Sequence, residues 1–488
     1  MRLAPALFLS LSCLSLAGVG SVAAGPTAPA PKSAHGGAAG AAPVSVLPFI
    51  EDDYKTARQQ AVSSKRLLVV DAWAAWCHTC LSMRNFVFTD ARLRPVADKF
   101  VYLAIDTEQP GNADFVARFP IQSWPTLLVL DPIPGAAGPA DGARVLARFT
   151  GAMTAPELLA RLEELARATS AEQVPLGEAD AAAAAGRWAA AAVLYARAAA
   201  RPELRVRARL GQIQSLRRLG QSQACAELAE AAHDEVGRSA TATDFFSYGA
   251  LCLDSVSDVD TRQRLRQKLR GYLEAVVTDP AAPLLPDDRS DGYGTLTELA
   301  DGLGDAAGGD RYTEARLQLL EAAAAQAKGP VAAATYDAHR LECYRRLKRY
   351  PPAEAMLLAS EKVMPDDYNP PARLARLYFD MGRLDDALGR IDRALRLAKG
   401  PRRVGMLELK ASIQHGLGQT RPAIATLEEA LRLAQPASPA AEALRTKAAE
   451  LRKNIEALHR TLEPEPGPQP RPRTPRGRPR VAGRENTL

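Results

Sequence analysis

The chain changes character at about residue 177, and this change constrains its fold more than any other feature. Beyond that point the strand signal disappears, and Ala- and Leu-rich segments with helical periodicity follow one another. Turn residues interrupt these segments at Gly186, Gly220, Lys348, Gly382 and Gly418. The first two are 34 residues apart, and the last three are separated by 34 and 36 residues. Because one helical hairpin cannot bury its apolar face alone, residues 177–460 are predicted to form a stack of hairpins.

This spacing, with a small residue at the turn between helices, resembles tetratricopeptide repeats. The clearest units are residues 371–400 and 403–434. The resemblance implies a concave surface that binds a protein partner. A non-repetitive helical domain remains the alternative. Residues 280–310 are rich in Pro, Gly and Asp and are predicted to form an irregular insertion.

Residues 45–168 show the opposite pattern, in which short apolar runs alternate with helical segments. Thr154 and Glu157 form a capping-box pattern at the start of the last helix. These features predict one α/β domain with a mixed sheet. Its strands are expected at 66–73, 100–105, 126–130 and 144–149, and its helices at 51–63, 114–119 and 154–168.

Two cysteines, Cys77 and Cys80, stand at the start of a predicted helix. Free N–H groups and the helix dipole favour a thiolate at the first cysteine, which can attack a disulfide, and the second can then resolve the mixed disulfide. The other cysteines beyond the first 24 residues lie singly in helical sequence and are expected to be small core residues; they are Cys225, Cys252 and Cys343.

The sequence around the cysteine pair resembles the thioredoxin family. Residues 70–80 read Val-Asp-Ala-Trp-Ala-Ala-Trp-Cys-His-Thr-Cys, similar to the active-site strand and turn. Residues 123–126, Ser-Trp-Pro-Thr, resemble the cis-proline loop, and residues 149–151, Phe-Thr-Gly, resemble the last strand. Residues 85–90, Asn-Phe-Val-Phe-Thr-Asp, resemble the corresponding segment in the C-terminal domain of the periplasmic interchange protein DsbD. The resemblance covers residues 45–168 and implies a central sheet flanked by helices.

The resemblance assigns roles to individual residues. Cys77 would be the exposed nucleophile, Cys80 the resolving cysteine and Asp71 the buried acid that exchanges a proton with Cys80. Pro125 would be the cis proline that exposes the backbone of Trp124 to substrate. Trp76 would also contact substrate and shield Cys77.

Two positions depart from the family pattern. His78 stands in the dipeptide between the cysteines and is expected to stabilise the Cys77 thiolate, especially when protonated. The alternative is a solvent-facing His78 with little effect. Tyr102 stands where thioredoxins often carry a lysine near the buried acid. No metal site is predicted, because Cys77, His78 and Cys80 alone lack further ligands at suitable spacing.

The first segment of the chain indicates export, and the last is predicted to be disordered. Residues 1–24 carry Arg2, an apolar run and Val22-Ala23-Ala24, the pattern of a cleaved signal peptide; an uncleaved membrane anchor is the alternative. Residues 25–44 read as a flexible leader. Residues 462–488 hold seven Pro and six Arg and are predicted to be a disordered tail. This tail alone supplies +3 of the net charge of +6, so the charge predicts no nucleic-acid partner.

Together these features predict a periplasmic protein-disulfide reductase or interchange enzyme that needs no cofactor beyond its Cys77–Cys80 disulfide. Its partners would be protein thiols and disulfides, a protein bound to the helical repeats and a membrane electron donor. The alternative is a repeat-based scaffold whose thioredoxin fold is redox-inert.

Overall fold

The computed structural model describes residues 43–132, 143–167, 176–434 and 442–462. Its first part contains a five-stranded mixed sheet with the order β1-β3-β2-β4-β5. The two central strands, β2 and β3, are buried runs that pair in parallel, whereas β4 and β5 are antiparallel. The strands are β1 (Phe49–Glu51), β2 (Leu68–Trp73), β3 (Val101–Asp106), β4 (Thr126–Asp131) and β5 (Arg144–Thr150).

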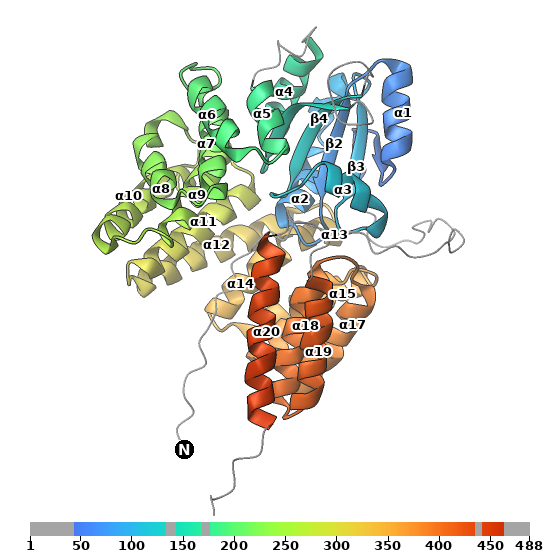
Figure 1. Cartoon of the computed structure of the whole chain (residues 1–488), viewed down its shortest axis with the longest axis vertical. Helices are drawn as coiled ribbons and strands as arrows, with labels where there is room; N and C mark the ends of the chain where they lie inside the picture. The colour runs from blue at the N-terminus through green and yellow to red at the C-terminus, as the bar shows by residue number, and fades with distance from the viewer. Residues whose placement is uncertain (1–42, 133–142, 168–175, 435–441, 463–488) are drawn as a thin grey trace, which may run out of the picture.

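Helices cover both faces of this sheet, as Figure 1 shows. The predicted mixed-sheet α/β domain is therefore present, with one addition: β1 precedes the first helix. Asp53 caps that helix by accepting a hydrogen bond from the backbone N–H of Thr56. The helices are α1 (Tyr54–Ser64), α2 (His78–Ser82), the π-helical turn Met83–Val87, the 3-10 turns Ala91–Val96 and Pro110–Asn112, α3 (Ala113–Arg118) and α4 (Ala155–Arg167).

The capping box predicted at the start of α4 is present. The Glu157 carboxylate accepts a hydrogen bond from the backbone N–H of Thr154, at 2.8 Å. The Thr154 hydroxyl in turn accepts a longer bond from the backbone N–H of Glu157, at 3.5 Å. These bonds satisfy donors that the helix itself leaves unpaired.

The second part of the chain is all-helical. Its α-helices are α5 (Gly177–Ala184), α6 (Trp188–Ala198), α7 (Arg205–Arg218), α8 (Ser222–Ala231), α9 (Ala240–Leu253), α10 (Val259–Val277), α11 (Pro286–Gly302), α12 (Ala306–Gln326), α13 (Pro330–Ala333), α14 (Asp337–Arg346), α15 (Tyr350–Val363), α16 (Asn369–Asp380), α17 (Leu384–Leu397), α18 (Arg402–Gly416), α19 (Thr420–Ala434) and α20 (Glu442–Leu462); short 3-10 turns lie at His233–Glu235 and Ala334–Tyr336. Consecutive helices pack as hairpins, so the prediction of helical repeats is confirmed.

The five predicted turns share one backbone conformation. Gly186, Gly220, Lys348, Gly382 and Gly418 all have positive φ values, between 55° and 76°. Glycine adopts this left-handed region at no steric cost, which explains its recurrence at these turns. Lys348 is the non-glycine member of the set, with φ 55°.

The prediction of an irregular insertion at residues 280–310 is wrong, because this stretch contains all of α11 and the start of α12. Pro286 begins α11, where a missing N–H costs nothing. Asp288 accepts a hydrogen bond from the backbone N–H of Leu285, and Asp305 caps α12. The Pro and Asp residues therefore start helices here instead of interrupting them.

The assignment of Cys225 and Cys252 as unpaired core residues is also wrong. Both are buried, and they form a disulfide that joins α8 to α9. Their separation of 27 residues gave no local signal of pairing. Cys343 is a buried free cysteine.

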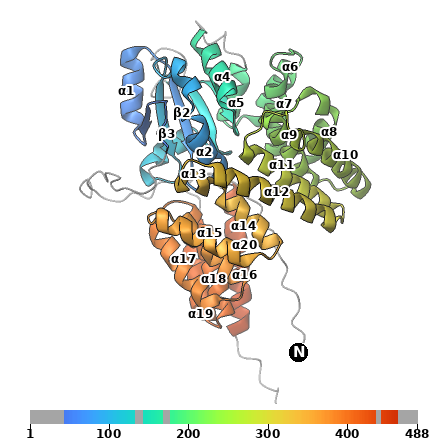
Figure 2. The same ribbon diagram turned by 180° about the vertical axis from the view of Figure 1, so that it is seen from behind.

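The sheet domain lies against two groups of helices, with α5–α12 beside it and α14–α20 below it in both views (Figures 1 and 2). α5 packs on β5, where Asp180 accepts a hydrogen bond from the backbone N–H of Arg148 at 3.1 Å. α11 and the turn Ala334–Tyr336 both contact α2. The helices therefore contact the sheet domain through packed side chains and hydrogen bonds, in addition to the covalent connection along the chain.

Within the described residues, no helix has both the length and the apolar character needed to cross a membrane. The predicted signal peptide, almost all of the leader and the predicted tail beyond Leu462 lie outside the described residues.

The shared turn conformation predicts opposite effects for two substitutions. Gly382→Ala should lower the free energy of unfolding by about 1 kcal/mol, because a side chain is disfavoured at its φ of 74°. Lys348→Gly should raise it by roughly 0.5 kcal/mol, because it removes the same strain. Urea unfolding followed by circular dichroism measures both. Equal effects of the same sign would contradict this explanation of the turns.

Candidate functional site

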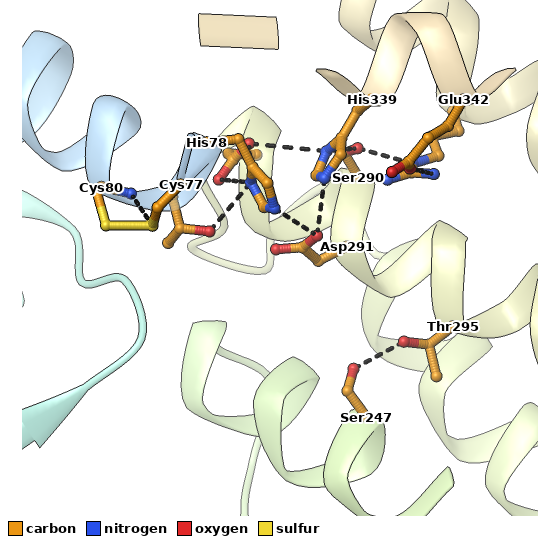
Figure 3. Close-up of polar contacts among 12 residues, drawn as sticks. Cys77, His78, Cys80, Ser247, Ser290, Asp291, Thr295, His339 and Glu342 are labelled. Carbon is orange, nitrogen blue, oxygen red and sulfur yellow. Dashed lines mark hydrogen bonds and ion pairs between the residues drawn. A yellow bond between two sulfur atoms is a disulfide. The ribbon is translucent and has the colours of Figure 1, made fainter. Parts of the chain in front are cut away.

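The paired cysteines lie where the sheet meets the helices. Cys77 is the N-cap residue of α2, and its Sγ accepts a hydrogen bond from the backbone N–H of Cys80 at 3.0 Å. The two sulfurs form a disulfide (Figure 3). This position gives a Cys77 thiolate, formed on reduction, the partial positive charge of the helix start.

The prediction that Cys77 is exposed is wrong, because only 4% of its surface is accessible. The neighbouring ring of Trp76 packs against the C-terminal helices, and the Arg402 guanidinium lies 4.6 Å from its centroid. Asn369 adds a hydrogen bond from its side-chain amide to the carbonyl oxygen of Ala75, at 3.2 Å. The sequence could not show these contacts, because Asn369 lies 294 positions after Ala75 and Arg402 lies 326 positions after Trp76.

The proline loop is held on the same face. The Trp124–Pro125 peptide bond is cis, and the Trp124 ring lies 5.3 Å from the ring of Trp76. Trp124 Nε1 donates a hydrogen bond to the Thr107 hydroxyl at 2.9 Å. The Ser123 hydroxyl is hydrogen-bonded to the hydroxyl of Tyr248 in α9, at 3.1 Å. Both helical groups therefore contact the surface expected to receive substrate.

The C-terminal helices approach the sheet domain closely at a second point. Tyr368 donates a hydrogen bond to Glu108, which lies just beyond β3. Burial raises the pKa of Glu108 to about 7. Gly400 lies so close that a Cβ there would come within 2.6 Å of the Glu108 carbonyl oxygen. The fit at this contact thus depends on a glycine.

Asp71 is buried in β2, with 1% of its surface exposed. Burial raises its pKa to about 7, although the nearby Arg84 guanidinium acts in the opposite direction. Arg84 Nη1 lies 3.6 Å from the Asp71 carboxylate, and the guanidinium covers the ring of Trp73 at 4.2 Å. At the position often held by a lysine, Tyr102 instead donates to the Val96 carbonyl oxygen at 2.7 Å.

Sequence reasoning missed Arg84 as the cation beside the buried acid. Arg84 lies four residues after Cys80, in the π-helical turn that continues α2. A lone arginine in an apolar segment after the cysteine pair is the signal that could have identified it.

His78 points into the helical region and not into solvent. Its Nδ1 donates to Asp287 of α11 at 3.0 Å, and its Nε2 lies 3.7 Å from Asp291. Burial lowers the pKa of His78, but these two carboxylates outweigh it and raise the pKa to about 9. The solvent-facing alternative is therefore wrong, and His78 connects the cysteine pair to α11.

A second histidine completes this cluster. Figure 3 shows the rings of His78 and His339 side by side, and their centroids are 3.7 Å apart. His339 is buried on α14, and burial together with nearby positive charges holds its pKa well below the usual range. Its Nδ1 lies 2.8 Å from the Ser290 hydroxyl, which accepts a bond from Arg316 at 2.9 Å. Asp287, Asp291 and His339 carried no sequence signal of a site.

The pKa of Asp71 predicts a pH-dependent effect on stability. As pH rises from about 4 to about 7, the unfolded chain ionises this carboxyl while the folded protein retains its proton, so the folded state loses stability. Asp71→Asn should remove this loss and stabilise the protein at pH 8 by on the order of 3 kcal/mol, with little gain near pH 4. Urea unfolding of both proteins at the two pH values measures the difference. An equal difference at both values would contradict the raised pKa.

Comparisons with known proteins give a sequence match to part of the sheet domain. Residues 50–132 match the sequence model of a thioredoxin-like family. A stretch of 91 residues is 30% identical to the thiol:disulfide interchange protein DsbD of Colwellia psychrerythraea, and it covers 18% of this chain and 14% of that protein.

Solved structures with similarity include a tetratricopeptide repeat protein from Parabacteroides merdae, with 13% identity, a TM-score of 0.38 and coverage of 58% of this chain and 97% of that one. Another is BtubC from P. vanneervenii, with 14% identity, a TM-score of 0.31 and coverage of 54% and 98%. The helical repeats are defined here by their own hairpins and turns. The chain thus combines a thioredoxin-like domain, which carries the Cys77–Cys80 disulfide, with tetratricopeptide-like helical repeats.

Proposed function

We propose that this chain is an exported thiol–disulfide oxidoreductase that reduces or interchanges disulfides in other proteins. One observation carries the proposal: the Cys77–Cys80 disulfide caps α2 beside the cis Pro125 loop of a thioredoxin-like domain. The match to a thiol:disulfide interchange protein supports the same chemistry.

The exchange takes place in two steps. The Cys77 thiolate attacks one sulfur of a substrate disulfide, and the other substrate sulfur leaves as a thiolate that takes up a proton. Cys80 then loses its proton and attacks Cys77, which releases the second substrate thiolate. The substrate gains two electrons and two protons, and the cysteine pair becomes a disulfide. A thiol donor, for which a membrane protein is the proposed source, restores the dithiol.

Asp71 is the proposed acceptor of the Cys80 proton. Its pKa of about 7 suits a group that both accepts and returns a proton near neutral pH. Trp76 and Trp124 flank the site, and the backbone of Trp124 before Pro125 is the proposed pairing edge for an extended substrate.

Access to Cys77 is restricted, because its side chain is buried beside Trp73, Trp76 and Trp124, and the C-terminal helices pack against Trp76. We propose that a protein partner of the helical repeats, or the substrate itself, displaces the contacts of Arg402 and Asn369 with the segment before Cys77. The buried Cys225–Cys252 disulfide supports an oxidising location such as the periplasm, because disulfides persist there.

The burial of Cys77 equally favours the second candidate function, a repeat-based scaffold in which the Cys77–Cys80 disulfide is inert. In that case the thioredoxin-like domain would serve only as a packing unit for α11, α14 and the C-terminal helices.

The order of attack gives the first test. With insulin as the disulfide substrate, reduced Cys80→Ser protein should accumulate a covalent adduct on non-reducing gels, because Cys77 can attack but no thiol releases it. Cys77→Ser should form none. In the wild-type pair, Asp71→Asn should slow release by roughly tenfold or more and leave the first attack largely intact. If Cys80→Ser traps nothing, even after prolonged incubation, the oxidoreductase proposal fails.

The reduction potential separates the two candidate functions. An active Cys77–Cys80 pair should titrate above about −300 mV, whereas an inert structural disulfide lies below that value. Equilibration with dithiothreitol buffers followed by thiol alkylation measures it. The double variant Cys77→Ser/Cys80→Ser is the matched control, since it reports the Cys225–Cys252 disulfide alone. A potential below −300 mV would support the scaffold.

A further inference from the structure

The cluster of polar side chains between α2 and the helices contains more than the His78–Asp287 ion pair needs. Two imidazoles and a carboxylate, His78, His339 and Asp287, come from three helices, α2, α14 and α11. One ligand atom from each lies within 4.8 Å of the others. We propose that these three residues bind a divalent transition-metal ion, with zinc as the best match to their donor atoms.

The distances between the donor atoms fit such an ion. His78 Nδ1 is 3.1 Å from Asp287 Oδ1, and His339 Nδ1 is 3.9 Å from the same oxygen. Ligand atoms of a tetrahedral zinc ion, with bonds of about 2.0–2.1 Å, lie about 3.3 Å apart. Small side-chain movements therefore bring all three atoms into the coordination sphere.

The hydrogen bonds of His339 already present the correct nitrogen. Arg316 donates to the Ser290 hydroxyl, so the proton of that hydroxyl is directed to His339 Nδ1. His339 Nδ1 therefore carries a lone pair, and its Nε2 carries the hydrogen. This lone pair accepts the Ser290 proton, so a metal ion at Nδ1 would take the place of that hydrogen bond, with the Asp287 carboxylate 3.9 Å away as a second ligand.

Asp291 provides the outer support that metal-binding histidines require. Its Oδ1 lies 3.7 Å from His78 Nε2 and 3.4 Å from His339 Nε2. Each ring thus directs its Nδ1 towards Asp287 and its Nε2 towards Asp291. A carboxylate behind the ring fixes its tautomer and orientation at many metal sites.

Charge favours the same conclusion. Asp287 is completely buried at the start of α11, where its carboxylate needs a positive partner. At His78 the ion would replace the proton shared with Asp287, since imidazole binds metals in its neutral form. The ion would then connect His78 to α11 and α14. This binding does not depend on the redox activity proposed above.

Zinc binding to the oxidised full-length chain, prepared without a histidine tag and treated with a chelator, tests the proposal. The Cys77–Cys80 disulfide is kept intact, so its sulfurs cannot supply thiolates. Isothermal titration with zinc sulfate should show one ion per chain. Asp287→Asn and His339→Gln should each weaken zinc binding at least 100-fold, and Asp291→Asn should weaken it about 10- to 100-fold.

His233→Gln is the matched control, because this histidine pairs with Asp234 away from the cluster and should leave affinity unchanged. Cys343→Ala should also retain zinc, which excludes the free thiol that the described residues contain. Cobalt in place of zinc should give visible bands of a tetrahedral complex that disappear in His339→Gln. Absence of binding by the wild-type chain, or unchanged binding in both ligand variants, would overturn the proposal. Insulin reduction by the metal-free protein tests the oxidoreductase activity separately.

Discussion

A carboxylate that is completely buried needs a counter-charge, and the counter-charge of Asp287 comes from α2, the helix that begins at the cysteine pair. Its partner, His78, lies between the two cysteines. The buried carboxylate of α11 is therefore paired with a residue of α2, and this pairing helps to fix the position of α2. His339 packs on the same imidazole and connects α14 to this point. Through His78, the segment that carries the cysteine pair contacts both α11 and α14.

Two interactions therefore compete for one surface of the sheet domain: the docking of a substrate and the packing of the helices. The thioredoxin-like domain holds its disulfide at a helix start beside a cis proline, where a protein substrate would dock. The helices use the same surface to bury Trp76 and to bind the loop around Ser123. A helical cover with several polar contacts, such as that of Asn369, can open at a lower cost than a wholly apolar one.

Local sequence patterns predicted the elements well and their long-range contacts poorly. The strands, the cysteine pair and the cis proline loop follow from short motifs, and the hairpin turns follow from the need for glycine at positive φ. The prolines and aspartates around α11 were misread, because the same residues cap helices and break them. The contact of His78 with Asp287 spans 209 residues, and no local pattern carries such information. The Cys225–Cys252 pairing was missed for the same reason.

The position of the helical cover in the chain has a consequence in time. Domains tend to fold in order from the N-terminus during synthesis, so the sheet domain and its cysteine pair are complete before most of the repeats exist. Asp287 joins the chain 209 residues after His78, and the helices that bury Trp76 come later still. Each newborn molecule thus passes through an interval in which Trp76 lacks its helical cover, and the helices later close over a sheet domain whose cysteine pair is already in place.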